Sequence, residues 1–298
     1  MALINLLASN QAVLIAFSVV LGLLVGSFLN VVIYRLPLML QRDWKAQCYE
    51  FLELKAPEAK DVSTAAGFDK FNLIKPDSHC PHCHTAVKAW QNIPLVSYAL
   101  LGGKCASCRT PISLRYPGVE LASGILSGLV AVSFGAGWLT LSALLFTWSL
   151  IALTLIDYDH QLLPDNITIP LLWLGLLLAA ANYGLVPLQD AVIGAIAGYL
   201  VLWAFYWSFK LLTGKEGMGY GDFKLLAALG AWLGWQSLLP IIILSSLVGA
   251  VFGILMIALF KRDRSAPMPF GPYLAGAGFI MLIWGPELTT LYLNGFAS

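Results

Sequence analysis

The chain has 298 residues, of which 59% are hydrophobic and 11% are charged, and its formal net charge is +1. Soluble domains carry roughly 25% charged residues, and a chain this apolar would expose large hydrophobic patches in water. The composition therefore excludes an ordinary soluble domain and favours an integral membrane protein. The small net charge gives no indication of a nucleic-acid partner.

Eight apolar runs are candidates for membrane-spanning helices, each of which takes about 20 residues. The first run is too long for the apolar core of a signal peptide, and no basic segment precedes it, so we expect it to remain as an anchor. The sixth run is short. In chain order the runs are Gln11–Tyr34, Gly118–Ser133, Trp138–Ile156, Ile167–Ala181, Leu188–Leu212, Phe223–Trp235, Leu238–Phe260 and Phe270–Leu291.

The one sizeable polar stretch, residues 36–117, contains two CxxC pairs separated by 21 residues. Each pair points two thiolates at one point, and two pairs supply the four sulfur ligands of a closed, structural zinc site. The separation slightly exceeds the roughly 15–20 residues of zinc ribbons. A redox-active CxxC or four unrelated thiols are the alternatives. The predicted ligands are Cys80, Cys83, Cys105 and Cys108.

Other residues near the cysteine pairs leave further possibilities open. Three histidines crowd the first pair and are more simply explained as exposed neighbours than as replacement ligands: His79, His82 and His84. Cys48 stands alone and is expected to be an ordinary residue. Residues 42–75 carry no motif. A zinc cross-link would supply folding energy to a domain too small and polar for a large core.

Two acidic segments border predicted spans, where a carboxylate is costly and therefore a candidate for function. Asp157 follows the third span and Asp222 precedes the sixth. Two crossings separate them, so both reach the same face of the membrane. We expect Asp159 to be either functional or structural, and Asp165 to cap a helix.

Two facing carboxylates in a partly desolvated site cannot both ionise easily, so one keeps its proton. The charged member can then activate a water while the protonated member protonates a leaving amide. Gly219 and Gly221, just before Asp222, let the backbone bend or approach a neighbour closely. The sequence contains no GxSxG or HExxH motif for other hydrolytic chemistry.

The basic residues give the orientation. All 17 Lys and Arg lie in, or at the span ends beside, the connections reached after an odd number of crossings, and the opposite connections contain none. The positive-inside rule makes the basic face cytoplasmic and leaves both termini outside. The predicted fold is an all-α polytopic membrane protein with about eight transmembrane helices and a small zinc-binding cytoplasmic domain after the first.

These features together resemble the bacterial type IV prepilin peptidases, which are GxGD membrane aspartic proteases. The resemblance covers nearly the whole chain and rests on the paired cysteine motifs and on five further segments. They are Gly26–Val32, Ile93–Cys105, Ile112–Pro117, Asp157 with Pro164 seven positions later, and the GxGD signature Gly219–Asp222.

The resemblance implies a leader peptidase of the bacterial inner membrane. It would cleave type IV prepilins and type II secretion pseudopilins after a Gly on the cytoplasmic side, with Asp157 and Asp222 as the catalytic pair. It would then methylate the new N-terminus with S-adenosylmethionine. For that methyl donor, the N–H groups of Gly102, Gly103 and Lys104 and the Lys104 cation are possible contacts, although a plain turn explains these residues equally well.

The sequence divides into a transmembrane anchor (1–35), a cytoplasmic domain (36–117) and a seven-span bundle with the aspartates (118–298). Two other classes of function remain open. A proton-coupled transporter predicts carboxylates near mid-span and an inverted repeat, and neither is visible. A secretion-system scaffold would use the zinc domain for docking and the aspartates as helix caps.

Overall fold

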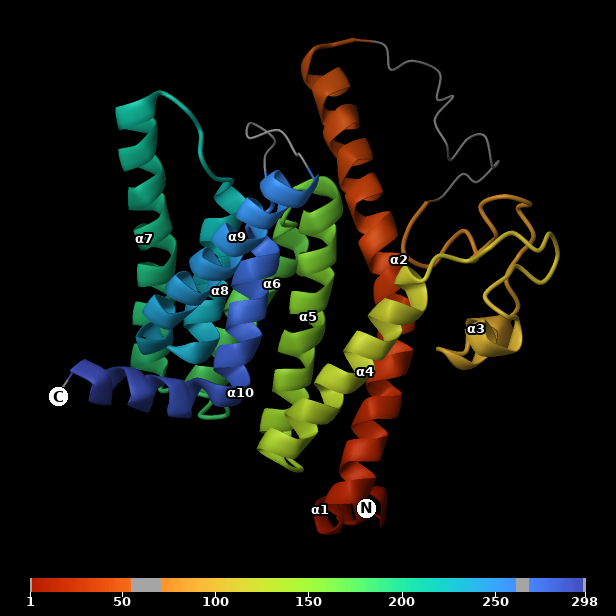
Figure 1. Cartoon of the computed structure of the whole chain (residues 1–298), viewed down its shortest axis with the longest axis horizontal. Helices are drawn as coiled ribbons and strands as arrows, with labels where there is room; N and C mark the ends of the chain where they lie inside the picture. Colours follow the sequence, from red (N-terminus) through yellow and green to blue (C-terminus); the bar gives the residue numbers. More distant parts are fainter. Residues whose placement is uncertain (1, 55–70, 261–267, 297–298) are drawn as a thin grey trace. The chain divides into compact units, whose positions relative to one another are not determined.

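The computed structural model describes residues 2–54, 71–260 and 268–296 (Figure 1). Part of the motif-free stretch 42–75 and the basic residues Lys261, Arg262 and Arg264 lie outside the described residues. Within them the chain is all-helical, with two isolated β-bridges. The elements are α1 (Ala2–Ser9), α2 (Gln11–Phe51), η1 (Ala89–Asn92), α3 (Val96–Leu100), α4 (Arg115–Phe134), α5 (Trp138–His160), α6 (Asp165–Ala180), α7 (Leu188–Thr213), α8 (Tyr220–Leu233), η2 (Trp235–Ser237), α9 (Leu238–Phe260) and α10 (Gly271–Phe296).

Each of the eight predicted apolar runs forms a helix, from α2 and then from α4 through α10. Among the described residues, five segments are long and apolar enough to cross a membrane: α2, α4, α5, α7 and Trp235–Leu259. Helices α6 and α8 have only 16 and 14 residues. At 1.5 Å per residue, α8 is about 21 Å long, less than the roughly 30 Å hydrocarbon core. The chain is an all-α polytopic membrane protein.

The first compact unit, residues 16–128, is built on a close crossing of α2 and α4. Gly22 and Gly26 lie one turn apart on α2, and a Cβ at Gly26 would come 2.8 Å from the Glu120 Cα. Ser127 faces Gly22 from α4. In a membrane, where no hydrophobic force drives helices together, small residues allow the close packing that holds such a pair.

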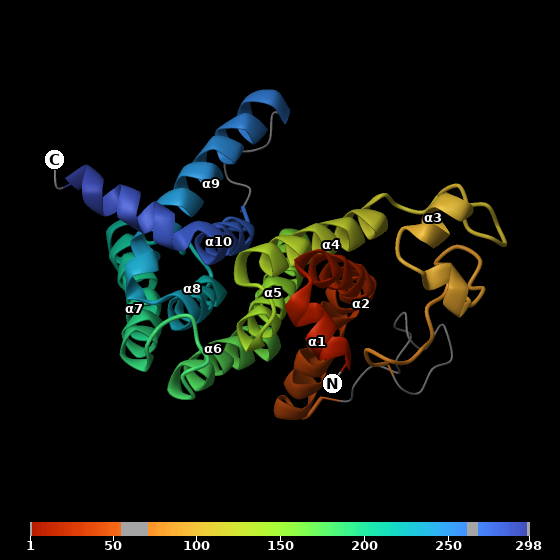
Figure 2. The ribbon, with the colours of Figure 1, turned by 90° about the horizontal axis from the view of Figure 1, so that it is seen from below.

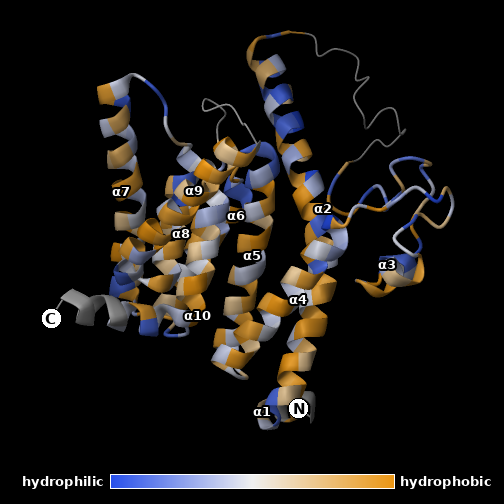
Figure 3. Ribbon diagram, in the orientation of Figure 1, coloured by the Kyte–Doolittle hydropathy of each residue, from blue (hydrophilic) through white to orange (hydrophobic). Residues whose placement is uncertain are grey.

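Helix α2 is longer than the sequence predicted, because it continues past Tyr34 to Phe51 and through Pro37. Figure 3 shows its apolar first half giving way to a second half in which hydrophilic and hydrophobic residues are mixed. Proline removes one helical N–H, but good helix formers follow and sustain the helix. Arg35 donates from Nη1 to the Asn72 carbonyl (2.9 Å) and from Nη2 to the Pro76 carbonyl (2.6 Å). The helix thus passes the predicted domain boundary at residue 35 without a break.

The second compact unit, residues 1–15 and 129–298, surrounds the short helix α8. In Figure 2, α8 lies among α7, α6 and α10, and it packs against all three. Every residue from Asp222 to Leu233 except Lys224 is buried. This enclosure explains how so short a helix is accommodated, since its ends do not have to match the bilayer surfaces.

Glycines bring α7 and α8 into backbone contact. A Cβ at Gly194 would collide with the Gly230 carbonyl, and a Cβ at Gly198 would come 2.6 Å from the Leu226 carbonyl oxygen. On the α6 side, the Trp232 indole N–H donates to the Leu171 carbonyl at 2.8 Å. These contacts fix how α8 is rotated about its own axis and where it lies along α7 and α6.

The last two helices differ in their surroundings. Only 11% of the apolar window in Trp235–Leu259 is buried in the protein, and Figure 3 shows α9 as strongly hydrophobic, so most of α9 is suited to face lipid. Helix α10 covers all but the first residue of the predicted span Phe270–Leu291, and it bends within that span at Trp284 (φ −118°, ψ 16°). Pro286, which cannot donate a helical hydrogen bond, accounts for the kink.

Candidate active site and metal centre

Asp157 lies in the last turn of α5, with its side chain buried. The helix ends because Gln161 takes a left-handed conformation (φ 51°), from which its N–H returns to the Asp157 carbonyl at 2.8 Å. The Asp157 Oδ2 accepts the backbone N–H of Gly271 at 2.9 Å. The carboxyl group is therefore tied to the first residue of α10.

Asp222 is the third residue of α8 and is also buried. Its carboxyl group accepts a hydrogen bond from the backbone N–H of Gly219, the residue that precedes the helix. Its Oδ1 has no hydrogen-bond partner within the described parts of the chain. Buried polar atoms are almost always paired, so an orphaned carboxyl oxygen is expected where a water or a substrate binds.

The structure brings Asp157 and Asp222 together, as the crossing count predicted. The charge of Asp157 acts directly on the Asp222 carboxyl, and the buried side chain of Leu163 lies beside both helix starts. A Cβ at Gly221 would come 2.8 Å from the Leu163 Cβ, and a Cβ at Gly271 would come 3.1 Å from its Cδ2. The starts of α8 and α10 thus contact the same leucine.

The two glycines before Asp222 differ in whether the surrounding structure requires a glycine. Gly219 has φ −83°, an ordinary extended conformation, so no sharp bend requires glycine there. Gly221 lies in the first turn of α8, and its missing Cβ makes room for Leu163. The close approach that the sequence suggested is observed at Gly221, and the bend is not.

The other two predicted aspartates lie outside this pair. Asp159 is exposed at the end of α5. Asp165 was expected to cap α6, but the N-cap residue is Pro164 and no side-chain cap bond forms. Both carboxyl oxygens of Asp165 instead lie 2.7 Å from the Lys224 Nζ. This ion pair connects the first residue of α6 with the fifth residue of α8.

The four predicted sulfur ligands converge. Their Sγ atoms all lie within 4.8 Å of one another, with Cys80 and Cys108 3.8 Å apart and Cys83 and Cys105 4.0 Å apart. A tetrahedral zinc with Zn–S bonds of about 2.3 Å requires S···S distances of about 3.8 Å. The cluster therefore fits a tetrahedral metal ion, and the histidines near it are not part of this group.

The two cysteine loops are built alike. In the first, the Cys80 N–H donates to the Thr85 carbonyl (3.0 Å) and His84 has φ 56°. In the second, the Cys105 N–H donates to the Thr110 carbonyl (2.9 Å) and Arg109 has φ 61°. This conformation is uncommon for residues other than glycine.

A threonine follows the second cysteine of each loop. The Thr85 hydroxyl lies 3.3 Å from the Cys83 Sγ and lowers the pKa of that thiol. The Thr110 hydroxyl lies 3.2 Å from the Cys108 Sγ and has the same effect. Both contacts favour the thiolate, which is the form that binds a metal.

Comparisons with known proteins agree with this arrangement. Residues 20–134 match the model of the bacterial peptidase A24 N-terminal domain, and residues 144–254 match that of the type IV leader peptidase family. The chain belongs to the type IV leader peptidase family. The two matches contain the four cysteines and both buried aspartates, respectively.

Relatives of this family are similar over nearly the whole chain. A prepilin leader peptidase/N-methyltransferase of Stutzerimonas stutzeri is 56% identical, covering 98% of each chain. Proteins of the same description from Pseudomonas aeruginosa and Neisseria gonorrhoeae are 54% and 53% identical, covering 99% and 92% of this chain and 98% and 93% of their own. No solved structure matches the chain.

The Gly102–Lys104 turn does not offer free N–H groups. The N–H of Gly102 donates to Ala99, that of Gly103 to Tyr98 and that of Lys104 to Leu101, at 3.1, 2.9 and 3.3 Å. Gly102 and Gly103 have φ of 60° and 68° and close the turn after α3. The predicted N–H contacts to a methyl donor do not fit this geometry, and the alternative of a plain turn does.

Sequence reasoning missed two residues that the structure singles out. Gly271 holds Asp157, and no local pattern marked it. Glu120, half-buried in α4, accepts the Leu95 N–H at 2.9 Å and a hydrogen bond from Ser27. Glu120 lies inside a predicted span, so the rule that carboxylates are costly there would have found it. It joins two family segments, Gly26–Val32 and Ile93–Cys105.

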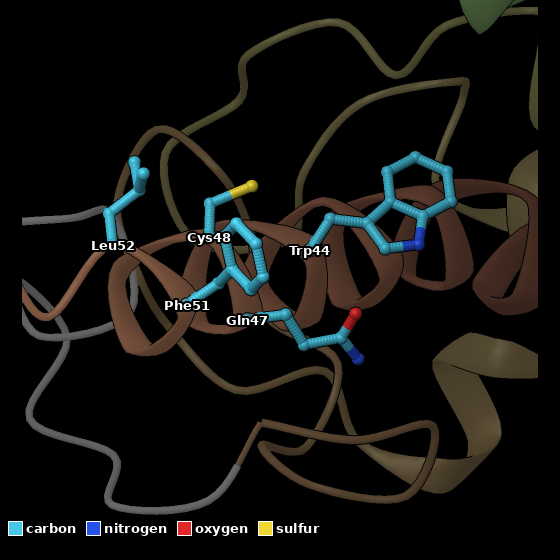
Figure 4. Close-up of a pocket in the computed structure, with 5 residues that line it drawn as sticks. All are labelled: Trp44, Gln47, Cys48, Phe51 and Leu52. Atoms are coloured by element: carbon cyan, nitrogen blue, oxygen red, sulfur yellow. The ribbon is translucent and has the colours of Figure 1, made fainter.

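An open depression of about 570 Å³ lies at the end of α2 (Figure 4). All of its lining residues come from the last turns of α2 and the residue after it: Trp44, Gln47, Cys48, Phe51 and Leu52. It contains the exposed thiol of Cys48 and none of the clustered cysteines or buried aspartates. A hollow along one helix lacks the converging polar groups of a ligand site.

Proposed function

We propose that the chain is a membrane aspartic endopeptidase that cleaves the leader of type IV prepilins and pseudopilins, and an N-methyltransferase that modifies the new N-terminus. The observation that carries the peptidase proposal is the meeting of two buried carboxyl groups, Asp157 and Asp222, at the ends of two helices. The prepilin substrate and the methylation come from the relatives' descriptions, and pseudopilins are added on the resemblance to the prepilin peptidases.

The proposed cleavage uses the two carboxyl groups as one unit. Because they are buried together, one is charged and the other holds a proton. The charged carboxylate takes a proton from a water, whose oxygen attacks the scissile carbonyl. The protonated carboxyl gives its proton to the leaving amide nitrogen as the C–N bond breaks. The unpaired Oδ1 of Asp222 is available for the water or the substrate.

We propose the bacterial inner membrane as the location, with the aspartates at the cytoplasmic face and both termini in the periplasm. The asymmetric distribution of basic residues supports this orientation. A basic leader would remain cytoplasmic while the apolar stem of the substrate lies in the bilayer. The division into an anchor, a cytoplasmic domain and a seven-span bundle follows from the same topology.

We propose that Cys80, Cys83, Cys105 and Cys108 hold a structural zinc ion. The sulfur spacing supports this, and four protein ligands leave no open position for chemistry. S-adenosylmethionine, the proposed methyl donor, would supply an activated methyl group. Of the contacts suggested for it, the exposed Lys104 cation is the one the turn leaves available.

A cleavage assay tests the proposal. Purified protein in detergent is incubated with a prepilin, and mass spectrometry measures the product. Loss of the leader identifies the peptidase, and a further mass gain of one methyl group with S-adenosylmethionine identifies the methyltransferase. An intact prepilin would favour the transporter or scaffold alternatives. The position of both aspartates at helix ends already argues against a mid-span proton site.

A further inference from the structure

The start of α10 contacts Asp157 across 114 positions of sequence separation. The first N–H groups of a helix have no partner within the helix. In α10, Pro272 has no N–H, and those of Tyr273 and Leu274 donate to the Phe270 carbonyl at 3.1 and 3.2 Å. The N–H of Gly271 is therefore the first-turn donor left over, and it donates to the Asp157 Oδ2 at 2.9 Å.

The approach leaves no room for a side chain at position 271. A Cβ there would lie 2.6 Å from the Asp157 Oδ2 and 3.1 Å from its Cγ. It would also lie 3.1 Å from the Leu163 Cδ2. Real Cβ atoms essentially never come within 3.0 Å of another heavy atom, so the carboxyl group would have to move.

We propose that Gly271 is a positioning residue of the aspartate site. Its N–H holds the Asp157 carboxyl group in place, and its missing Cβ lets the positive end of the α10 helix dipole approach that carboxyl. This inference rests on the proposed peptidase function. It adds the first turn of α10 to a site for which the sequence predicted only the last turn of α5 and the first turn of α8.

The test replaces Gly271 by alanine. Gly271→Ala should lower kcat for prepilin cleavage about 100-fold, the effect of displacing a reacting group by about 1 Å, with KM nearly unchanged. Gly276→Ala is the matched control in the same helix, because a Cβ at Gly276 meets nothing within 4 Å. It should cleave like the wild type. Thermal unfolding in detergent is measured for both.

A second substitution separates the contact with Asp157 from the contact with Leu163. If Gly271→Ala acted only by crowding Leu163, adding Leu163→Val would restore cleavage. We expect no restoration, because the collision with the carboxyl oxygen remains. Recovery in the double variant, or wild-type kcat in Gly271→Ala, would overturn the proposal. Failure of the wild type itself to cleave would instead refute the peptidase function.

Hydrogen exchange provides a test that does not need an active or correctly folded Gly271→Ala protein. Asp157→Ala removes the acceptor, so the Gly271 amide should exchange faster than in the wild type. The Tyr273 amide, which donates to the Phe270 carbonyl, should keep its protection. Unchanged protection of Gly271 would show that Asp157 does not hold this N–H, and would overturn the proposal.

Discussion

Replacing Asp222 by asparagine removes the acid–base chemistry proposed for this residue and leaves the shape of the side chain nearly intact. The side chain is 7% exposed and packed at the start of α8, so asparagine should occupy the same space. A buried polar atom without a partner costs about 1–3 kcal/mol, and the Asp222 Oδ1 already carries this cost. An unpaired amide NH₂ in its place therefore adds little to the cost of folding. A folded but inactive protein is the expected result.

Activity should be lost even though most of the protein remains folded. General acid–base catalysis contributes about 10²–10⁴-fold per step, and an amide can neither accept the proton of the water nor share a proton with Asp157. Because the two carboxyl groups are proposed to act as one unit, Asp157→Asn should be equally inactive. The double variant should be no worse than either single one, since residues that act as a unit lose activity non-additively.

The assay compares initial rates of leader removal for the wild type, both single variants and the double variant at matched folded concentration. Thermal unfolding and metal content confirm that each variant is folded. Asp159→Asn, at the exposed neighbour of the pair, is the control and should retain substantial activity. Wild-type cleavage by purified Asp222→Asn protein would refute the two-aspartate mechanism.

Three further predictions concern the metal, an ion pair and the attachment of the segment between α2 and α4. The wild type should contain about one zinc per chain by elemental analysis. Cys80→Ser should lower the zinc content, and Cys48→Ser, at an exposed cysteine, should not. A folded wild type without metal would contradict the proposed zinc site. Asp165→Asn should destabilise the protein by only about 0–1 kcal/mol, because Lys224 is partly exposed. Cleavage should therefore be nearly unchanged, and a tenfold loss would contradict a minor role for this ion pair. Arg35→Gln should weaken two charge-assisted hydrogen bonds worth about 1.5–3 kcal/mol each and speed proteolysis of residues 71–114; an unchanged digestion rate would show that Arg35 is dispensable.

Features that depend on apolar runs and short spacings were predictable from the sequence. The eight runs became helices because burial in lipid or in the bundle decides their structure. The convergence of the four sulfurs followed from two CxxC spacings, each of which fixes two thiols locally. Counting crossings placed Asp157 and Asp222 on one face, and the structure brings them together.

Features that depend on tertiary contacts were not predictable. The Gly271–Asp157 hydrogen bond joins helices far apart in sequence, and no local pattern distinguishes Gly271 from other glycines. Helix α2 extends to Phe51 because nothing after Pro37 ends it, whereas hydropathy alone located the end of its apolar part. The N–H groups at Gly102–Lys104 looked available until the turn that uses them was known.

The glycine contacts between α7 and α8 have a consequence for how the site responds to distant change. Gly230 lies eight residues beyond Asp222, about 12 Å along the helix axis. Because backbone meets backbone at Gly194, any added side chain there must tilt or turn the whole of α8. Because a helix moves as a rigid body, such a rotation also displaces Asp222 at the start of α8. Random mutagenesis should therefore find inactivating substitutions at the glycine contacts between α7 and α8 as well as around the carboxyl groups.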